Sequence, residues 1–570
     1  MKKILLLIEM FIAMSLQAQV VSTVEYQIAT PWLGFGYNQW PFLRDSSGLI
    51  NIPWTDTAWA TTQDRILAIK PSMVRLLLDR SWFNSTDDQV PLPIGTYNWN
   101  GKLMKEVYKS MDFYKQQGIK VMCGLWHSGY GQNDTDQTFL QSSGTGSFAQ
   151  LQADLIDYLI RVKGYTNMVF YAPLNEPAGY VPSYTTYDVM LKNLYNELKS
   201  RNLPDTILTA ADSWGDWVWL PAQKDKNLLS AYDAHLYLND TPLDTYNWLY
   251  NETLESYLSA SLMSIASYDN SNKPFIMSEL APVGVLYCDW YQNAIQAPAY
   301  CQNETYEYGL GYLDYAIQLT RSGVSGGLAW ALDGFDQNKD AGMWNNSGQH
   351  GGFLLRPWYY VWQWMCRNFP SGSTILHMSE PNKDLRIAGA LIDNTDFSFA
   401  VINRNAGAVN GTQTLTLKAP AGQKTFYVYY YSNTSKGDGS SLTLPYTTMT
   451  TNNLSTDGIT VTIPPETGVF LTTLLPYLPT SSIDSQQETT EIEPAIKVYP
   501  NPASDQIFVQ FTKPESAQVE LYRLDGQLIN TLQITQLYNA INVQQLNIQG
   551  VVIVKVITAD HVYTTKIIVR

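Results

Sequence analysis

The 570-residue sequence predicts an α/β protein in which a (β/α)8 barrel is followed by a β-sandwich domain and a small C-terminal β-sandwich. Three observations support this prediction. From residue 31 to about residue 370, apolar strand-like runs alternate with amphipathic helices. After residue 385 the pattern changes to short runs of period-two alternation without helices. A polar, acidic stretch then separates a last strand-rich segment. We therefore expect a signal peptide at 1–18, a barrel domain at 19–372, a β-sandwich at 373–476, a linker at 477–494 and a third domain at 495–570.

The N-terminus has the pattern of a secretory signal peptide. Lys2 and Lys3 precede an apolar run over residues 4–14, and Ala18 provides a small residue at the expected cleavage site. This run is too short to span a bilayer, and no later stretch offers eighteen consecutive apolar residues. We therefore expect a protein that is secreted or held at the outer cell surface, without a transmembrane segment.

Eight strands are expected in the barrel, at 34–40, 72–78, 119–126, 168–174, 206–211, 230–237, 274–279 and 326–332. Between them lie amphipathic helices, one with Leu103, Val107, Met111 and Tyr114 on one face, and one that starts at Ser147. Eight such repeats have the size of a TIM barrel with enlarged loops. A doubly wound open sheet is the competing fold, but no G-x-G-x-x-G motif follows the first strand.

Two β-rich domains are predicted by the alternation of apolar and polar residues and by the turn residues between the alternating runs. Strands are expected at 396–403, 412–418, 425–431, 458–463 and 467–474, separated by Gly, Asn, Ser and Pro, which is typical of a β-sandwich. Residues 479–494 are polar and acidic, as in a flexible linker. The segment 496–570 is again rich in strands.

Composition narrows the class of partner. The formal net charge is −15, which disfavours nucleic acid and anionic lipid. The chain contains 17 Trp and 38 Tyr, and flat rings of this kind stack on sugars as well as on one another in a core. A neutral saccharide suits this protein, and we expect a monomer.

The four cysteines do not indicate a metal site. None of them has C-x-x-C spacing, so structural zinc is not expected. Cys288 and Cys301 are close enough in sequence to bridge a short loop in an exported protein. Cys123 lies in an apolar strand and is expected in the core.

Polar residues recur where the predicted strands end. The apolar run 169–174 stops at Asn175, Glu176 and Pro177, and a barrel brings all carboxyl ends of its strands to one mouth. Each of these residues alone could be structural, but two of only five histidines lie at such ends. The candidate site residues are Arg75, His127, Asn175, Glu176, His235, Tyr237, Glu279 and Trp330.

This set closely resembles the pattern of glycoside hydrolase family 5, within the clan of retaining (β/α)8 glycosidases that includes cellulases. The resemblance covers roughly residues 30–370. It implies that Glu176 is the acid/base, that Glu279 is the nucleophile, and that Arg75, His127, Asn175, His235, Tyr237 and Trp330 form a supporting shell. Two departures are Ala281, where a glycine often stands, and Trp126-His127 at the end of the third strand.

The chemistry of retention explains why these residue types occur together. It needs two carboxyl groups about 5 to 5.5 Å apart, one ionised and one protonated. Arg75 and Tyr237 suit the ionised Glu279, and His235 could orient Glu176. Asn175 is placed to bond a sugar 2-hydroxyl, and Trp330 to form a stacking floor. Neighbouring subsites could be lined by Trp126, Trp214, Trp217 and Trp344, and no cofactor or metal is required.

Two other motifs resemble an esterase elbow and a calcium site but do not fit either one. Gly323-Val324-Ser325-Gly326-Gly327 matches G-x-S-x-G, but the esterase elbow needs a strand before the serine and a helix after it, whereas the reverse is predicted here. Asp333, Asp336 and Asp340 lack the spacing of a calcium loop and are expected in a solvated loop.

The C-terminal segment also resembles a known family. Val498-Tyr499-Pro500-Asn501-Pro502, with a later Leu524-Asp525-Gly526 turn, resembles the sorting domain of the type IX secretion system of Bacteroidetes. This resemblance implies export by the type IX machinery as a partner. A β-rich carbohydrate-binding module is the alternative.

Together these features predict a secreted retaining β-glycosidase that acts on a polysaccharide such as a β-glucan, cellulose or β-mannan. The alternatives are a clan member that acts on xylan or glycolipid, and a non-catalytic surface protein that binds glycans.

Overall fold

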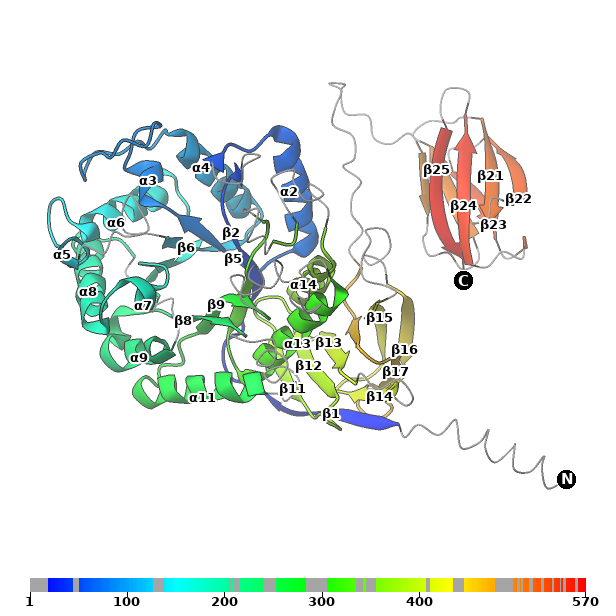
Figure 1. Ribbon diagram of the computed structural model, residues 1–570. Coiled ribbons are helices and arrows are strands. Elements are labelled where there is room, and N and C mark those ends of the chain that lie inside the picture. Colours follow the sequence, from blue (N-terminus) through cyan, green and yellow to red (C-terminus); the bar gives the residue numbers. More distant parts are fainter. Residues whose placement is uncertain are drawn as a thin grey trace, which may run out of the picture. The chain divides into compact units, whose positions relative to one another are not determined.

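A computed structural model describes two compact units, Met1–Thr480 and Ser481–Arg570 (Figure 1). In the first unit the described residues are 19–44, 51–126, 137–204, 207–209, 215–238, 253–282, 305–334, 342–344, 355–405, 411–433 and 445–476. In the second they are 496–499, 503, 506–511, 516–523, 527–535, 538–543, 545–546, 550–558 and 562–569. The expected signal peptide and linker, and the pair Cys288 and Cys301, lie outside these ranges.

Seven parallel strands form the barrel, in the order β7-β6-β5-β2-β10-β9-β8. Most residues of these strands are buried, including polar ones in β2 and β8, as is usual for a parallel sheet that is covered by helices. The strands are β2 (Gly34–Gln39), β5 (Met73–Leu78), β6 (Lys120–Leu125), β7 (Met168–Ala172), β8 (Tyr232–Tyr237), β9 (Phe275–Ala281) and β10 (Gly326–Ala329).

The expected fifth strand is reduced to a single bridge within the described residues. Leu208 pairs in parallel with Tyr171 of β7, and the Thr209 N–H donates to the Tyr171 carbonyl over 3.1 Å. On the other side, the Ser230 N–H donates to the Leu208 carbonyl over 2.9 Å. Residues 207–209 therefore link β7 to the entrance of β8 and close the ring.

Helices surround these strands (Figure 1). Ser147, where the sequence predicts a helix to start, is the N-cap of α6, and its side chain accepts from the Gln150 N–H. The four apolar residues expected on one face of α4 are all buried. The longer helices are α2 (Asp56–Ile69), α4 (Lys102–Gln116), α6 (Phe148–Asp157), α8 (Tyr184–Ser200), α11 (Thr253–Tyr268), α13 (Tyr306–Ser322) and α14 (Pro357–Asn368), and the short ones are α3 (Arg80–Phe83), α5 (Gln137–Leu140), α7 (Pro177–Tyr180) and α9 (Leu220–Lys224).

The sandwich takes its first strand from N-terminal residues that were expected in the barrel domain, within 19–372. Residues 20–23 of β1 (Val20–Gln27) pair in parallel with β14, and later residues of β1 pair with β11, so the strand passes between two sheets. The other strands are β11 (Thr374–Met378), β12 (Leu385–Ile392), β13 (Asp396–Asn403), β14 (Gln413–Lys418), β15 (Lys424–Tyr431), β16 (Thr447–Thr451), β17 (Ile459–Ile463) and β18 (Thr467–Thr472).

The core of the barrel extends onto one face of the sandwich, which also has a hydrophobic core of its own. Helix α13 lies against β12 and β13, with α14 beside it (Figure 1). Arg321 of α13 donates to the carbonyls of Met378 and Ile387 over 2.7 and 2.9 Å, and Trp364 of α14 packs on Phe470. Burial of this aromatic and apolar surface holds the two parts together.

The second unit is built from strands alone among its described residues. Buried Val and Ile residues fill the space between a three-stranded and a four-stranded sheet. The strands are β19 (Ile496–Tyr499), β20 (Gln506–Phe511), β21 (Ala517–Arg523), β22 (Leu528–Ile534), β23 (Tyr538–Asn542), β24 (Gly550–Ile557) and β25 (Val562–Val569).

Three smaller predictions can be compared with the structure. Ser325 lies between α13 and β10, so the G-x-S-x-G match is a helix-to-strand turn as predicted. Cys123 is fully buried in β6. Asp333 is also buried, which corrects the expectation of a solvated loop, whereas Asp336 and Asp340 lie outside the described residues.

Within the described chain, none of the helices has both the length and the apolar character needed to cross a membrane.

Candidate active site

Glu176 follows β7 at a sharp change of backbone direction. Its φ and ψ of 47° and 51° lie in the left-handed region, which costs a non-glycine residue about 1 to 2 kcal/mol. Pro177 begins α7 directly afterwards, and the Asn175 N–H is held by the Leu125 carbonyl at 2.8 Å. The chain thus fixes a strained residue at the barrel mouth, and its side chain is 25% exposed.

Glu279 is buried on β9 and both of its carboxylate oxygens are occupied. Arg75 Nη1 donates to Oε1 over 2.6 Å, and the Tyr237 hydroxyl donates to Oε2 over 2.6 Å. The pKa of Tyr237 is raised well above 10 by loss of hydration and then by the charge of Glu279. The phenol is therefore a neutral hydrogen-bond donor, and both contacts favour the ionised form of Glu279.

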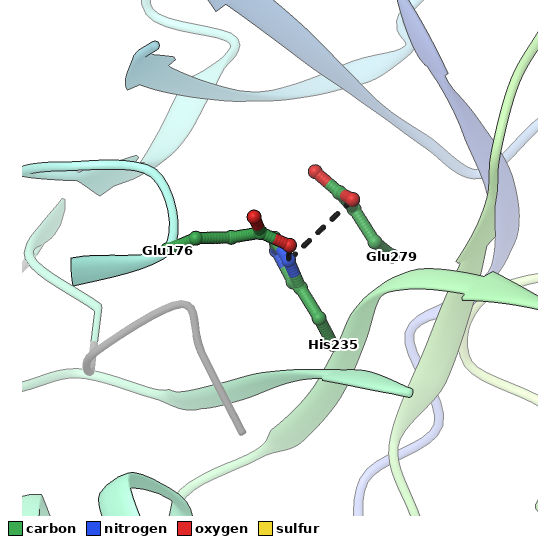
Figure 2. Close-up of side chains that lie close together, drawn as sticks. All are labelled: Glu176, His235 and Glu279. Atoms are coloured by element: carbon green, nitrogen blue, oxygen red, sulfur yellow. Dashed lines mark hydrogen bonds and ion pairs between the residues drawn. The ribbon is translucent and has the colours of Figure 1, made fainter. Parts of the chain in front are cut away.

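His235 connects the two glutamates. Its Nδ1 lies 2.9 Å from Oε1 of Glu176 and 3.4 Å from Oε2 of Glu279. Figure 2 shows the three side chains converging from three separate elements. An oxygen of each carboxylate and Nδ1 all lie within 4.8 Å of one another.

Arg75, fully buried on β5, connects the remaining polar groups of the site. Nη2 donates to Oδ1 of Asn175 over 2.7 Å, and Nη1 donates to Oδ1 of Asn38 over 2.9 Å as well as to Glu279. Sequence reasoning missed Asn38 because a polar residue inside a strand has no local signal of function. The available signal was the pairing register, which sets Asn38 opposite Arg75.

The remaining candidates, five tryptophans and one histidine, are not part of this hydrogen-bonded cluster among the described residues. Trp330 directly follows β10 and is only 5% exposed, and its ring stacks on that of Trp126 with 5.8 Å between the ring centroids. Trp126 is partly buried and also contacts Trp40 at 5.0 Å. Trp344 is fully buried beneath Arg65, so the expectation that it lines a subsite was wrong. His127 and Trp214 lie outside the described residues, and Trp217 packs on Tyr184 and Tyr187.

The same cluster could in principle offer ligands to a metal. Glu176, His235 and Glu279 each provide one donor atom within the 4.8 Å limit. However, the Arg75 guanidinium lies 2.6 Å from the Glu279 carboxylate, and its fixed positive charge opposes a cation there. The arrangement suits a paired acid and nucleophile better than it suits a metal.

Comparison with known proteins identifies the C-terminal unit. Residues 497–570 match the secretion system C-terminal sorting domain. The expectation of a sorting domain is therefore confirmed, and the protein is secreted or located at the outer cell surface. No curated protein sequence matches the chain.

The barrel and sandwich are similar in fold to solved glycoside hydrolases. A family 30 endoxylanase from Clostridium papyrosolvens C71 is 12% identical, with a TM-score of 0.53 over 80% of this chain and 100% of that chain. Xylanase C of family 30 from Talaromyces cellulolyticus is 15% identical, with a TM-score of 0.53 over 80% and 100%. A family 51 α-L-arabinofuranosidase from Bifidobacterium longum is 13% identical, with a TM-score of 0.53 over 80% and 99%.

These similarities confirm the predicted fold class, a (β/α)8 barrel with an attached β-sandwich, ahead of the sorting domain. The three structures belong to families 30 and 51, whereas the sequence motifs resemble family 5. The fold is therefore shared more widely than the family 5 resemblance implied.

Proposed function

We propose that this protein is a secreted retaining β-glycosidase that hydrolyses O-glycosidic bonds of a polysaccharide by double displacement. The observation that carries the proposal is the close approach of Glu176 and Glu279, with an oxygen of each within 4.8 Å. Retaining enzymes hold their two carboxyl groups about 5 to 5.5 Å apart, whereas inverting enzymes separate them by about 6.5 to 9.5 Å to admit a water.

In the first step Glu279 attacks the anomeric carbon while Glu176 gives its proton to the leaving oxygen. The glycosidic bond breaks, and a covalent glycosyl ester forms on Glu279. In the second step Glu176 takes a proton from a water molecule, the water oxygen attacks the anomeric carbon, and the ester bond breaks. Each step therefore balances with water as the only co-substrate.

The surroundings of each carboxyl group fit its role. Glu279 is buried and receives hydrogen bonds from a guanidinium and a phenol, which favour the anion needed for attack. Glu176 has a partly exposed side chain, and among the described residues its carboxyl group is held by His235 alone, so it can reach a leaving group and a water. His235 would keep Glu176 oriented in both steps.

Asn175 supplies a donor for the substrate. Its Oδ1 is held by Arg75, which directs Nδ2 elsewhere, and Nδ2 is buried without a hydrogen-bond partner among the described residues. A buried amide donor left unpaired costs about 1 to 3 kcal/mol. A sugar 2-hydroxyl that accepts from Nδ2 would remove this cost, most strongly in the transition state.

The substrate class follows from charge and aromatic content. A formal charge of −15 disfavours acidic polysaccharides, and the indoles of Trp126 and Trp330 near the site suit the C–H faces of neutral sugars. We propose a neutral β-glucan, cellulose or β-mannan, presented to the enzyme after export by the type IX machinery. Xylan is the alternative, because two proteins of similar fold are xylanases.

A panel of aryl β-glycosides and soluble β-glucans, mannans and xylans tests this proposal. Wild-type protein should hydrolyse at least one member, and Glu279→Gln should lose about 1,000-fold or more of that rate. A non-catalytic glycan-binding protein would instead bind a polysaccharide with no difference in hydrolysis between wild type and Glu279→Gln, and that result would overturn the proposal.

A further inference from the structure

We infer that Asn38 is a positioning residue of this glycosidase, which sets the position of Arg75 between Glu279 and Asn175. This inference rests on the proposed function. Asn38 lies on β2 and is fully buried. Among the described residues its side chain bonds Arg75 and backbone carbonyls, and it forms no hydrogen bond with the carboxyl group of Glu176 or Glu279.

The orientation of the Asn38 amide is fixed by its surroundings. Nδ2 lies 2.9 Å from the Ser278 carbonyl, 3.2 Å from that of Leu328 and 3.3 Å from that of Ala329. Carbonyl oxygens only accept hydrogen bonds, so the NH2 group must face them. Oδ1 is therefore turned to the opposite side, where it accepts from Arg75 Nη1 over 2.9 Å.

Asn38 consequently connects the backbone of β9 and β10 with the side chain of Arg75, which is far from both strands in the sequence. Ser278 immediately precedes Glu279 on β9, and Leu328 and Ala329 are the last two residues of β10, directly before Trp330. The same amide also bonds the guanidinium that bonds Glu279 and Asn175. The side chain thus couples the backbone of the nucleophile strand to the cation that faces the nucleophile.

Glu279 and Asn175 also bond Arg75, but both are expected to interact with substrate during the reaction. Asn38 is instead hydrogen-bonded to the backbone of two strands and is not proposed to bind the sugar. It can therefore hold the guanidinium in the same position throughout the reaction. Without it, Arg75 can move toward Asn175 or away from the carboxylate, and small displacements in a site reduce rates by up to about 100-fold.

The sandwich contains a matched control. Asn403 is also fully buried on a strand, and its Nδ2 donates to the carbonyls of Gly411, Ile463 and Pro464 over 2.6, 3.0 and 3.1 Å. Its Oδ1 accepts from the Asn405 backbone N–H, not from a site residue. Replacement of either asparagine removes the same kind of bonds, but only Asn38 contacts Arg75.

The experiment compares full-length wild type, Asn38→Ala, Asn403→Ala and Arg75→Lys on an aryl β-glycoside that the wild type cleaves. For Asn38→Ala we expect kcat to fall about 10- to 100-fold with little change in KM. The acidic limb of its kcat/KM profile should move to higher pH, because a carboxylate with a less well placed cation takes up its proton more easily. Asn403→Ala should lose thermal stability without either kinetic change.

A double variant separates positioning from general destabilisation. If Asn38 acts through Arg75, Asn38→Ala should add less than three-fold to the loss already caused by Arg75→Lys. Full additivity, or an Asn38→Ala enzyme with wild-type kcat and pH profile, would overturn the inference while leaving the glycosidase proposal intact. If Asn38→Ala does not fold, Asn38→Ser, which keeps one donor for the carbonyls, replaces it.

A readout that needs no turnover makes the two proposals distinguishable. In a crystal structure of Asn38→Ala, or of Asn38→Ser in its place, the Arg75 guanidinium should be displaced from its position beside Glu279. An unchanged guanidinium would contradict the inference even if no substrate were found. Failure of the wild type on every glycoside would contradict the proposed function alone.

Discussion

Arg75 and Glu279, 204 residues apart in the sequence, form a fully buried ion pair with 2.6 Å between Nη1 and Oε1. Such a pair contributes little net stability, because both charges lose their hydration. Under the proposed function the pair serves the chemistry, because the guanidinium favours the ionised form of the carboxylate that has to attack the sugar. The predictions below follow from this pair and from the groups that surround it.

Replacement of Glu176 should impair substrates according to their leaving group. Glu176→Ala cannot protonate the leaving oxygen, so poor leaving groups should lose far more rate than activated aryl groups, by about 100-fold or more. Steady-state rates on a series of aryl glycosides measure this, and azide should restore the rate by replacing the water. Equal impairment across the series would mean that another residue is the acid.

Tyr237→Phe should lower kcat by about 10- to 100-fold, because a hydrogen bond to a charged group is worth about 1.5 to 3 kcal/mol. The pKa of Tyr237 is held well above 10, so the phenol does not titrate in the working range. The acidic limb of kcat/KM should therefore move to higher pH, and the alkaline limb should stay in place. Tyr232→Phe is the control, since Tyr232 on the same strand donates over 2.6 Å to Asp269.

Trp126→Ala should raise KM for oligosaccharides by about two- to ten-fold, as expected from the loss of one aromatic contact. The effect should be smaller on a short aryl glycoside that does not reach this ring. Trp219→Ala is the control, because Trp219 stacks on Tyr268 with nearly the same geometry, 5.9 Å and 17°. Equal KM values for Trp126→Ala and wild type on long substrates would exclude Trp126 from substrate binding.

Asp225 lies outside the candidate active site, and its shifted pKa should make the stability of the fold depend on pH. Burial, and then its hydrogen-bonded neighbour Asp188, raise the pKa of Asp225 to about 7. In the unfolded chain an aspartate titrates near about 3.9. The stability that Asp225 contributes is therefore complete below about pH 4 and is lost as the pH rises to about 7.

Asp225→Asn should remove this dependence, because an amide resembles the protonated acid and can still accept from the Tyr184 hydroxyl. Thermal unfolding at pH 5 and pH 8 should show a smaller decrease in Tm for Asp225→Asn than for wild type. The exposed Asp88→Asn serves as control. A decrease in Tm equal to that of wild type would refute this assignment.

The sequence was most informative where the fold itself brings residues together. Asn175, Glu176, His235 and Glu279 each stand near the end of an apolar run, and a barrel places such ends at one mouth whatever the spacing along the chain. Their convergence needed only the count of strands and helices. The orientation of each side chain depends on register, which no local pattern contains.

Three features could not be read from local patterns. The role of Asn38 depends on its pairing opposite Arg75. Strand β1 alternates like many other segments, and its partners β11 and β14 begin only at Thr374 and Gln413. Trp344 resembles a loop aromatic in the sequence, and only packing against Arg65 and Tyr359 buries it completely.

The most direct test of the central proposal is the anomeric configuration of the first product, followed by ¹H NMR during the hydrolysis of a β-glycoside. Double displacement by Glu279 and Glu176 predicts that the β-anomer appears first and then mutarotates to the equilibrium mixture. Initial release of the α-anomer would require a single displacement by water, and would contradict the assignment of Glu279 as a nucleophile.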